Sequence, residues 1–181
     1  MGQDWISIVL DADCKVVAWM APCKYGGSGG KLMEHSYIGN EFVSTFEFGL
    51  SPQGRYHKSR VVWAGDYADK EPDQEEHNLY SLCNEDKKNS EITPRMRMTL
   101  DYPFVVNHSK KLFVDKRKAL CDDYYDDEVH PLPILTAEGN GRGGGDYDEV
   151  DPPVGTWARD VISVEKTAPK GYEELMFYVQ E

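Results

Sequence analysis

The chain has 181 residues, of which 40% are hydrophobic and 12% aromatic, and its formal net charge is −12. This length suits one domain that buries roughly two-thirds of its unfolded surface, and the aromatic content argues against a disordered chain. The excess of 32 acidic over 20 basic residues disfavours non-specific attraction to nucleic acid or to an anionic membrane. We therefore expect a protein partner with a basic surface, no direct nucleic-acid contact and no membrane association.

The cysteines Cys14, Cys23, Cys83 and Cys121 form no C-x-x-C pair, so neither a zinc motif nor a disulfide framework is indicated. The first residues lack a signal-peptide pattern, and the chain has no apolar run of about 18 residues. The sequence therefore predicts a cytoplasmic, reduced protein.

The N-terminal half predicts a sheet. Alternating and apolar runs at Trp5–Asp11 and Lys15–Met20 are typical of a β-hairpin. Leu32 and Met33 begin a short predicted helix. Phe42–Phe48 is predicted to be a strand with one aromatic face, paired antiparallel with a strand at Arg55–Trp63.

The stretch Ser59–Asp69, S-R-V-V-W-A-G-D-Y-A-D, gives the clearest signal of a strand followed by a turn. Trp63 is predicted to anchor the core. Residues 69–91 are strongly polar and form a predicted excursion, in which Leu79–Cys83 is apolar enough for one short helix. Met96 and Met98 alternate with basic residues, which predicts a further strand nearby.

The C-terminal half contains a second predicted hairpin at Tyr102–Asp115, with His108 at its tip. His130–Thr136 is predicted to be extended, because each proline disfavours helix at the residue before it. Val161–Val164 is another predicted strand, and Tyr172–Val179 closes the chain as an edge strand or a short helix.

The expected fold is therefore α+β: a single domain over residues 1–181, mostly antiparallel β, with one or two short helices. Two segments interrupt it. The first is the polar excursion at 69–91, and the second is a long glycine-rich and acidic loop at 136–153. Loops of this length are usually functional or disordered.

The glycine-rich segment Gly139–Gly145 resembles a phosphate-binding loop only superficially, because acidic residues rather than a helix with lysine follow it. We expect no cofactor. The acids after it are weak metal-ligand candidates, because their spacing does not match a calcium-binding loop; they are Asp146, Asp148, Glu149 and Asp151.

Four residues are candidates for catalysis: Asp66, His108, Glu138 and Arg142. Asp66, Asp69, Glu138 and Arg159 could meet at one end of the sheet and supply paired carboxylates, as in hydrolases. However, the chain has no G-x-S-x-G or H-E-x-x-H motif. His108 has no adjacent nucleophile, so a solvated turn residue is the preferred interpretation.

Acidic runs at Asp69–Glu76, Asp122–Glu128 and Asp146–Asp151 indicate a different role. Carboxylates at intervals on a rigid sheet imitate a phosphate backbone, and tyrosines between them anchor a partner. The competing interpretation is that such runs are ordinary solvated loops. The predicted partner-binding residues are Asp122, Asp123, Tyr124, Tyr125, Asp126, Asp127, Glu128, Asp146, Tyr147 and Asp148.

Four motifs resemble a family of uncharacterised proteins found in tailed phages and varied microbes: V-V-W-A-G-D-Y-A-D, V-N-H-S-K-K-L-F-V-D, H-P-L-P-I-L-T-A-E-G-N-G-R-G-G-G-D-Y and V-G-T-W-A-R-D. The likeness spans roughly Leu32 to Val164 and implies no established activity. It implies that the following residues belong to one recurring arrangement: Trp63, Gly65, Asp66, Asn107, His108, Glu138, Gly139, Asn140, Gly141, Arg142 and Trp157.

These observations predict an acidic, non-enzymatic binding protein that inhibits a host defence or nucleic-acid-handling complex, as a nucleic-acid mimic. The alternative is a small enzyme or ligand-binding protein that uses the ends of the strands near Trp63 and Trp157, the Gly139–Gly145 loop and a divalent cation. Whether the protein is an enzyme stays open at this point.

Overall fold

The computed structural model describes residues 3–25, 29–85, 90–91, 102–119, 128–139, 150–151 and 154–179. Its strands are β1 (Trp5–Leu10), β2 (Val16–Met20), β3 (Ser59–Gly65), β4 (Ser90–Glu91), β5 (Phe104–Asn107), β6 (Leu112–Asp115), β7 (Ala137–Glu138), β8 (Val150–Asp151), β9 (Val161–Glu165), β10 (Glu173–Glu174) and β11 (Tyr178–Val179). Its helices are η1 (Pro22–Lys24), α1 (Leu32–His35), α2 (Glu41–Leu50), α3 (Leu79–Glu85), η2 (Lys116–Lys118) and α4 (Pro131–Leu135).

Among these residues the main sheet has nine strands, in the order β10-β6-β5-β9-β3-β1-β2-β4, with β7 paired to β3 beside this path. The pairs among β1, β2, β3, β5, β6 and β9 are antiparallel, whereas the short strands β4, β7 and β10 pair in parallel with β2, β3 and β6, respectively. The fold is α+β and β-rich, as predicted from the sequence, with four short α-helices rather than one or two.

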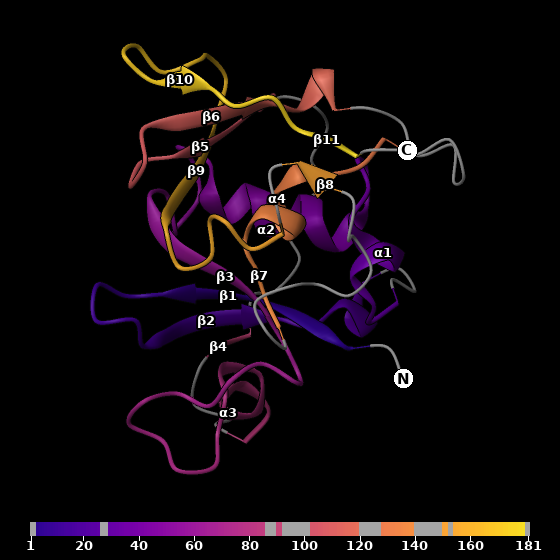
Figure 1. Cartoon of the computed structure of the whole chain (residues 1–181), viewed down its shortest axis with the longest axis vertical. Helices are drawn as coiled ribbons and strands as arrows, with labels where there is room; N and C mark the ends of the chain where they lie inside the picture. The colour runs from indigo at the N-terminus through magenta and orange to yellow at the C-terminus, as the bar shows by residue number, and fades with distance from the viewer. Residues whose placement is uncertain are drawn as a thin grey trace.

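The central strands are apolar on both faces because each face is covered. Side chains of β3 alternate between the two cores: Val61 and Trp63 lie in the larger one, whereas Val62 and Ala64 lie in the smaller one. Figure 1 shows α2 and α4 on one side of the β1–β3 region and α3 on the other. The smaller core therefore lies under α3.

Trp63 is fully buried, which confirms the predicted anchor. Its ring packs edge-on against Phe42 and Phe46, with centroid distances of 5.5 and 5.0 Å. Its indole nitrogen donates a hydrogen bond to His35 Nε2 over 3.0 Å. Both predicted hairpins are also present, as β1–β2 and β5–β6.

The predicted strand at Phe42–Phe48 is wrong, because these residues belong to helix α2. Asn40 caps this helix: its side chain accepts a hydrogen bond from Val43 N over 3.2 Å, which satisfies one of the unpaired amides of the first turn. The predicted pairing with Arg55–Trp63 is therefore wrong as well. The neighbours of β3 are instead β1, β7 and β9.

The extended conformation predicted for His130–Thr136 is also wrong, because α4 occupies most of this segment. Pro131 is the first residue of the helix, where the missing N–H costs no hydrogen bond. His130 supplies the cap, since its Nδ1 accepts from Leu132 N over 3.1 Å. The strand predicted around Met96 and Met98 lies outside the described residues.

Candidate functional site

Residues 69–76, here called the acidic loop, lie between β3 and α3, in the first part of the excursion predicted at 69–91. Figure 1 shows the segment between β3 and α3 projecting beside α3, away from the sheet. Four of its carboxylate side chains are exposed; they are Asp69, Asp73, Glu75 and Glu76. None of the four pairs with a lysine or arginine among the described residues, so the loop presents a concentration of negative charge.

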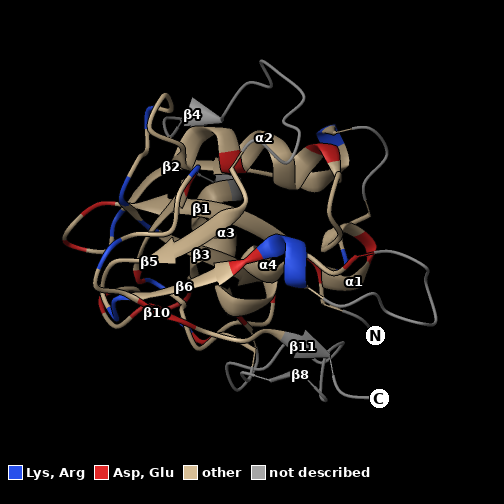
Figure 2. Ribbon diagram, turned by 90° about the horizontal axis from the view of Figure 1, so that it is seen from above, with Lys and Arg blue, Asp and Glu red and all other residues tan. Residues whose placement is uncertain are grey.

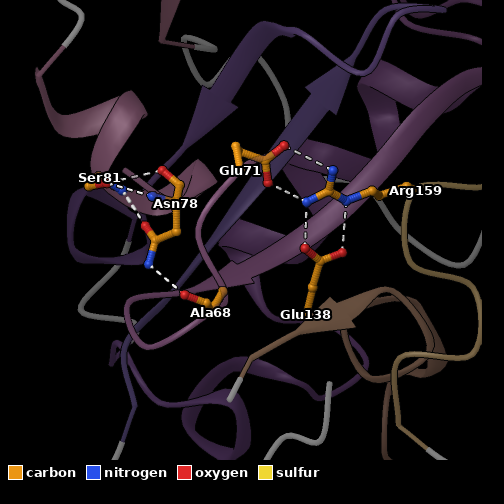
Figure 3. Close-up of polar contacts among 6 residues, drawn as sticks. All are labelled: Ala68, Glu71, Asn78, Ser81, Glu138 and Arg159. Atoms are coloured by element: carbon orange, nitrogen blue, oxygen red, sulfur yellow. Dashed lines mark hydrogen bonds and ion pairs between the residues drawn. The ribbon is translucent and has the colours of Figure 1, made fainter. Parts of the chain in front are cut away.

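Asn78 fixes the C-terminal end of the segment between β3 and α3 (Figure 3). Its side-chain amide donates to the carbonyl oxygens of Asp66 and Ala68, over 3.0 and 3.1 Å. Its Oδ1 accepts from Ser81 N, and its own N–H donates to Ser81 Oγ, as expected for a residue that caps a helix. The start of α3 and the end of β3 are therefore held together across the loop.

Glu71 has a different environment from the other acids of the loop. It forms a cluster with Arg159 and Glu138, here called the Arg159 cluster, in which the guanidinium lies between two carboxylates (Figure 3). Arg159 Nε donates to Glu138 Oε2 over 2.8 Å, and Nη1 donates to Glu71 Oε2 over 3.0 Å. Nη2 donates to the remaining oxygen of each carboxylate. All four carboxylate oxygens thus accept from one guanidinium.

The Arg159 cluster is partly buried: the side chains of Arg159, Glu71 and Glu138 are 26%, 9% and 14% exposed. Burial alone lowers the pKa of Arg159, but the hydrogen bonds to Glu138 and Glu71 outweigh it and raise the pKa above its ordinary value. The guanidinium is therefore charged at neutral pH.

The sequence predicted that Asp66, Asp69, Glu138 and Arg159 would meet at one end of the sheet. Glu138 and Arg159 do meet there, but the second carboxylate is Glu71, two residues beyond Asp69. Asp66 instead accepts a hydrogen bond from the backbone N–H of Asp4 over 3.1 Å. Asp66 therefore holds the N-terminal segment.

His108 lies in the turn between β5 and β6, as predicted, but it is half-buried rather than fully solvated. Its Nε2 lies 2.8 Å from Ser163 Oγ, and its Nδ1 lies 3.0 Å from the Tyr172 hydroxyl. Ser163 donates to Glu165 Oε1 over 2.7 Å, and His57 Nε2 lies 2.7 Å from the same oxygen. We call these five residues the polar chain.

The polar chain has one consistent assignment of protons. Because the Ser163 hydroxyl donates to a carboxylate, its oxygen accepts from His108 Nε2–H, and His108 Nδ1 accepts from Tyr172. Burial lowers the pKa of His108, which favours this neutral form. Ser163 is fully buried, so a substrate does not reach its hydroxyl in this conformation.

Sequence reasoning missed a third polar group, the buried charge cluster of Glu47, Lys116 and His130. Lys116 Nζ lies 2.6 Å from Glu47 Oε1, and His130 Nε2 lies 3.1 Å from the same oxygen. Figure 2 shows the basic turn η2, which carries Lys116, at the end of β6. Burial raises the pKa of Glu47, but Lys116 and His130 outweigh it and lower the pKa to about 2.

Burial is also the main reason that the pKa of His130 is lowered. The three residues lie on α2, η2 and the cap of α4. Their separation along the chain hid the cluster, and the wrong strand at Phe42–Phe48 placed Glu47 on a sheet. The basic run Lys116–Lys118 was the available signal.

Most predicted partner-binding residues lie outside the described residues: Asp122, Asp123, Tyr124, Tyr125, Asp126, Asp127, Asp146, Tyr147 and Asp148. Arg142 and the weak metal candidate Glu149 also lie outside them. Glu128 is exposed, and its carbonyl oxygen accepts from Ile38 N over 2.7 Å. Asp151 is described only as part of the backbone of β8.

The described part of the chain holds no group of three or more histidine, cysteine, aspartate or glutamate side chains that could bind a metal ion. Its helices are all too short or too polar to cross a membrane.

No family model matches the chain, and no curated protein or solved structure is significantly similar to it. The resemblance to a phage-associated family therefore stays a prediction, and any function has to be argued from the residues themselves.

Proposed function

We propose that the protein is a non-enzymatic acidic binding protein that recognises a basic surface of a protein partner, with the acidic loop as one contact surface. The observation that carries this proposal is the contrast within the loop. Glu71 is paired and nearly buried, whereas Asp69, Asp73, Glu75 and Glu76 are exposed and unpaired among the described residues.

The exposed carboxylates are suited to attracting a basic partner. A solvated loop needs no attachment, but this one is tied to the sheet through Glu71 and to the start of α3 through Asn78. Fixed charges steer a partner of opposite charge and lose little conformational entropy when it binds. Tyr67, which is 51% exposed next to the loop, offers an aromatic face to a lysine or arginine of the partner.

The finer form of the proposal concerns the partner. A net charge of −12 and carboxylates at intervals fit the basic groove of a nucleic-acid-handling complex, which the protein would inhibit by occupying it. The acidic runs at Asp122–Glu128 and Asp146–Asp151 add to this negative charge.

The alternative, a small enzyme using Glu138 and the strand ends, has less support. A general base needs an oxygen that can accept a proton from a substrate. Every carboxylate oxygen of Glu138 and Glu71 already accepts a hydrogen bond from Arg159. This pairing fits a structural role better than a catalytic one.

The proposal is tested by capture of partners from bacterial lysate with the tagged protein, at low and high salt. The test variant Asp73→Asn/Glu75→Gln/Glu76→Gln neutralises the acidic loop. The control variant Asp13→Asn/Glu41→Gln/Glu173→Gln removes the same charge at other exposed positions. A partner that is retained by the control, lost by the test variant and released by salt supports the proposal. Equal capture by both variants contradicts a role for the loop.

A second variant, with lysine at Asp122, Asp123, Asp126 and Asp127, tests the next acidic run in the same way. Loss of the partner would extend the contact surface to that run, and retention would exclude the run from it.

A further inference from the structure

Glu71 makes the side-chain contact that joins the acidic loop to the sheet. The other hydrogen bonds of the loop within the described part of the chain stay within residues 70–77: Glu71 N donates to His77 O, Gln74 N donates to Glu71 O, and Lys70 Nζ donates to Glu75 O. Without the Arg159 cluster, the loop would be attached mainly at its two ends.

The backbone of Arg159 gives a second reason to assign a role to its side chain. Its φ of +64° lies in the left-handed region, which disfavours residues with a Cβ and favours glycine. The turn is nevertheless well fixed, because Arg159 N donates to Val61 O over 2.7 Å and Arg60 Nη1 donates to Arg159 O over 3.0 Å. An arginine at this position therefore costs conformational free energy, which favourable contacts of its guanidinium have to offset.

The geometry requires arginine rather than any cation. The planar guanidinium donates to both oxygens of two carboxylates at once, which a lysine ammonium with one nitrogen cannot do. Because the carboxylates of Glu71 and Glu138 are largely buried, salt screens this contact less than it screens the exposed carboxylates of the loop.

We propose that Arg159 is a positioning residue whose guanidinium holds the acidic loop in one conformation, and that the exposed carboxylates bind a basic partner well only while Glu71 is held. The second half of this inference rests on the proposed function, whereas the first half does not.

Hydrogen exchange tests the first half. In Arg159→Gly, which suits the left-handed backbone, we expect the amides of Glu71 and Gln74 to exchange on the order of 10- to 100-fold faster than in the wild type. Arg159→Lys keeps the charge but should restore little of the protection. Lys110→Ala is the matched control: Lys110 bonds Thr156 O and Asp160 in the same turn and does not touch the loop.

Amides of the β1–β3 ladder serve as an internal reference, because their exchange should be unchanged if only the loop is released. Exchange of Glu71 and Gln74 within twofold of the wild type in Arg159→Gly would overturn the positioning role. Equal acceleration in the β1–β3 ladder would also overturn it, because Arg159 would then stabilise the whole fold.

Binding of a fluorescent dodecalysine peptide tests the second half. Arg159→Gly and Lys110→Ala each remove one positive charge, so net charge alone predicts slightly tighter binding for both. We expect tighter or equal binding for Lys110→Ala but several-fold weaker binding for Arg159→Gly. Equal affinities of these two variants would overturn the coupling. If the wild type does not bind the peptide, the proposed function fails for this probe, while the exchange result still decides whether Arg159 positions the loop.

Discussion

Lys116 Nζ lies 2.6 Å from Glu47 Oε1, and the two side chains are only 3% and 5% exposed. Removal of one member of such a pair leaves a buried charge without its partner, which typically costs about 3–5 kcal/mol. We therefore expect Glu47→Gln to lower the free energy of unfolding by about 3 kcal/mol or more, measured by urea denaturation.

The control for this prediction is Lys118→Ala, because Lys118 pairs with Glu174 at the surface, where the two side chains are 52% and 32% exposed. Exposed pairs contribute less than about 1 kcal/mol, so this variant should be nearly as stable as the wild type. Similar losses in Glu47→Gln and Lys118→Ala would mean that the buried pair has no special role in stability.

When the pH is lowered from about 6.5 to 4, the free energy of unfolding should decrease because His35 is buried in its neutral form. Burial lowers the pKa of this residue to about 4, whereas in the unfolded chain it titrates near the ordinary value. The unfolded state therefore binds the proton first as pH falls, and stability drops by up to about 1.4 kcal/mol per pH unit. His35→Gln should remove this part of the slope.

Denaturation curves measured between pH 7 and 4 check this expectation, with His57→Gln as the control at a partly exposed histidine. The slope should persist in His57→Gln. At lower pH Glu47 causes a further loss of stability. Its pKa is lowered to about 2, so its stabilising negative charge is lost as the pH falls from the ordinary pKa of glutamate towards 2. An unchanged slope in His35→Gln would contradict the prediction.

Helix α2 should depend on the cap supplied by Asn40. We expect Asn40→Ala to lower the free energy of unfolding by about 1 kcal/mol, because Val43 N loses its side-chain acceptor. Asn40→Asp keeps an acceptor and should stay close to the wild type. Thermal or urea denaturation separates these outcomes, and equal stability of the two variants would mean that the cap contributes nothing measurable to the free energy of unfolding.

The same helix shows why part of the fold escaped prediction. Aromatic and β-branched residues favour strands locally, and Phe46 and Phe48 fit an alternating pattern. Phe42 and Phe46, four residues apart, also fit one face of a helix, and both pack on Trp63. Asn40 as a cap was the local signal that could have decided between the two.

The hairpins β1–β2 and β5–β6 could be predicted because each is local: its pattern and its turn lie in one short stretch. The Arg159 cluster and the buried charge cluster could not be predicted in full, because their members come from distant segments. Glu47 and Lys116 are 69 residues apart, and Glu71 and Arg159 are 88 apart. Chain order does not say which carboxylate a distant cation will meet, and so Asp69 was predicted where Glu71 is found.

Two fully buried serines should respond in opposite ways to replacement by alanine. Ser163 bridges His108 and Glu165 in the polar chain. Ser163→Ala leaves His108 Nε2–H without its acceptor and removes one of the two contacts of Glu165 Oε1, whose other contact is His57, so it should cost about 1–3 kcal/mol. Ser7 Oγ has no hydrogen-bond partner among the described residues, so Ser7→Ala should be neutral or slightly stabilising. Urea denaturation of both variants checks this contrast, and equal losses would argue against the polar chain.

The most direct test of the account is the affinity of the protein for the dodecalysine peptide, measured for the wild type, the acidic-loop variant Asp73→Asn/Glu75→Gln/Glu76→Gln and the control Asp13→Asn/Glu41→Gln/Glu173→Gln. All three proteins are compared at the same low salt concentration, and the two variants have equal net charge. We expect the control to bind nearly as well as the wild type, and the acidic-loop variant to bind about tenfold more weakly. Equal affinity of the two variants would show that only net charge matters, and would contradict the acidic loop as a binding surface.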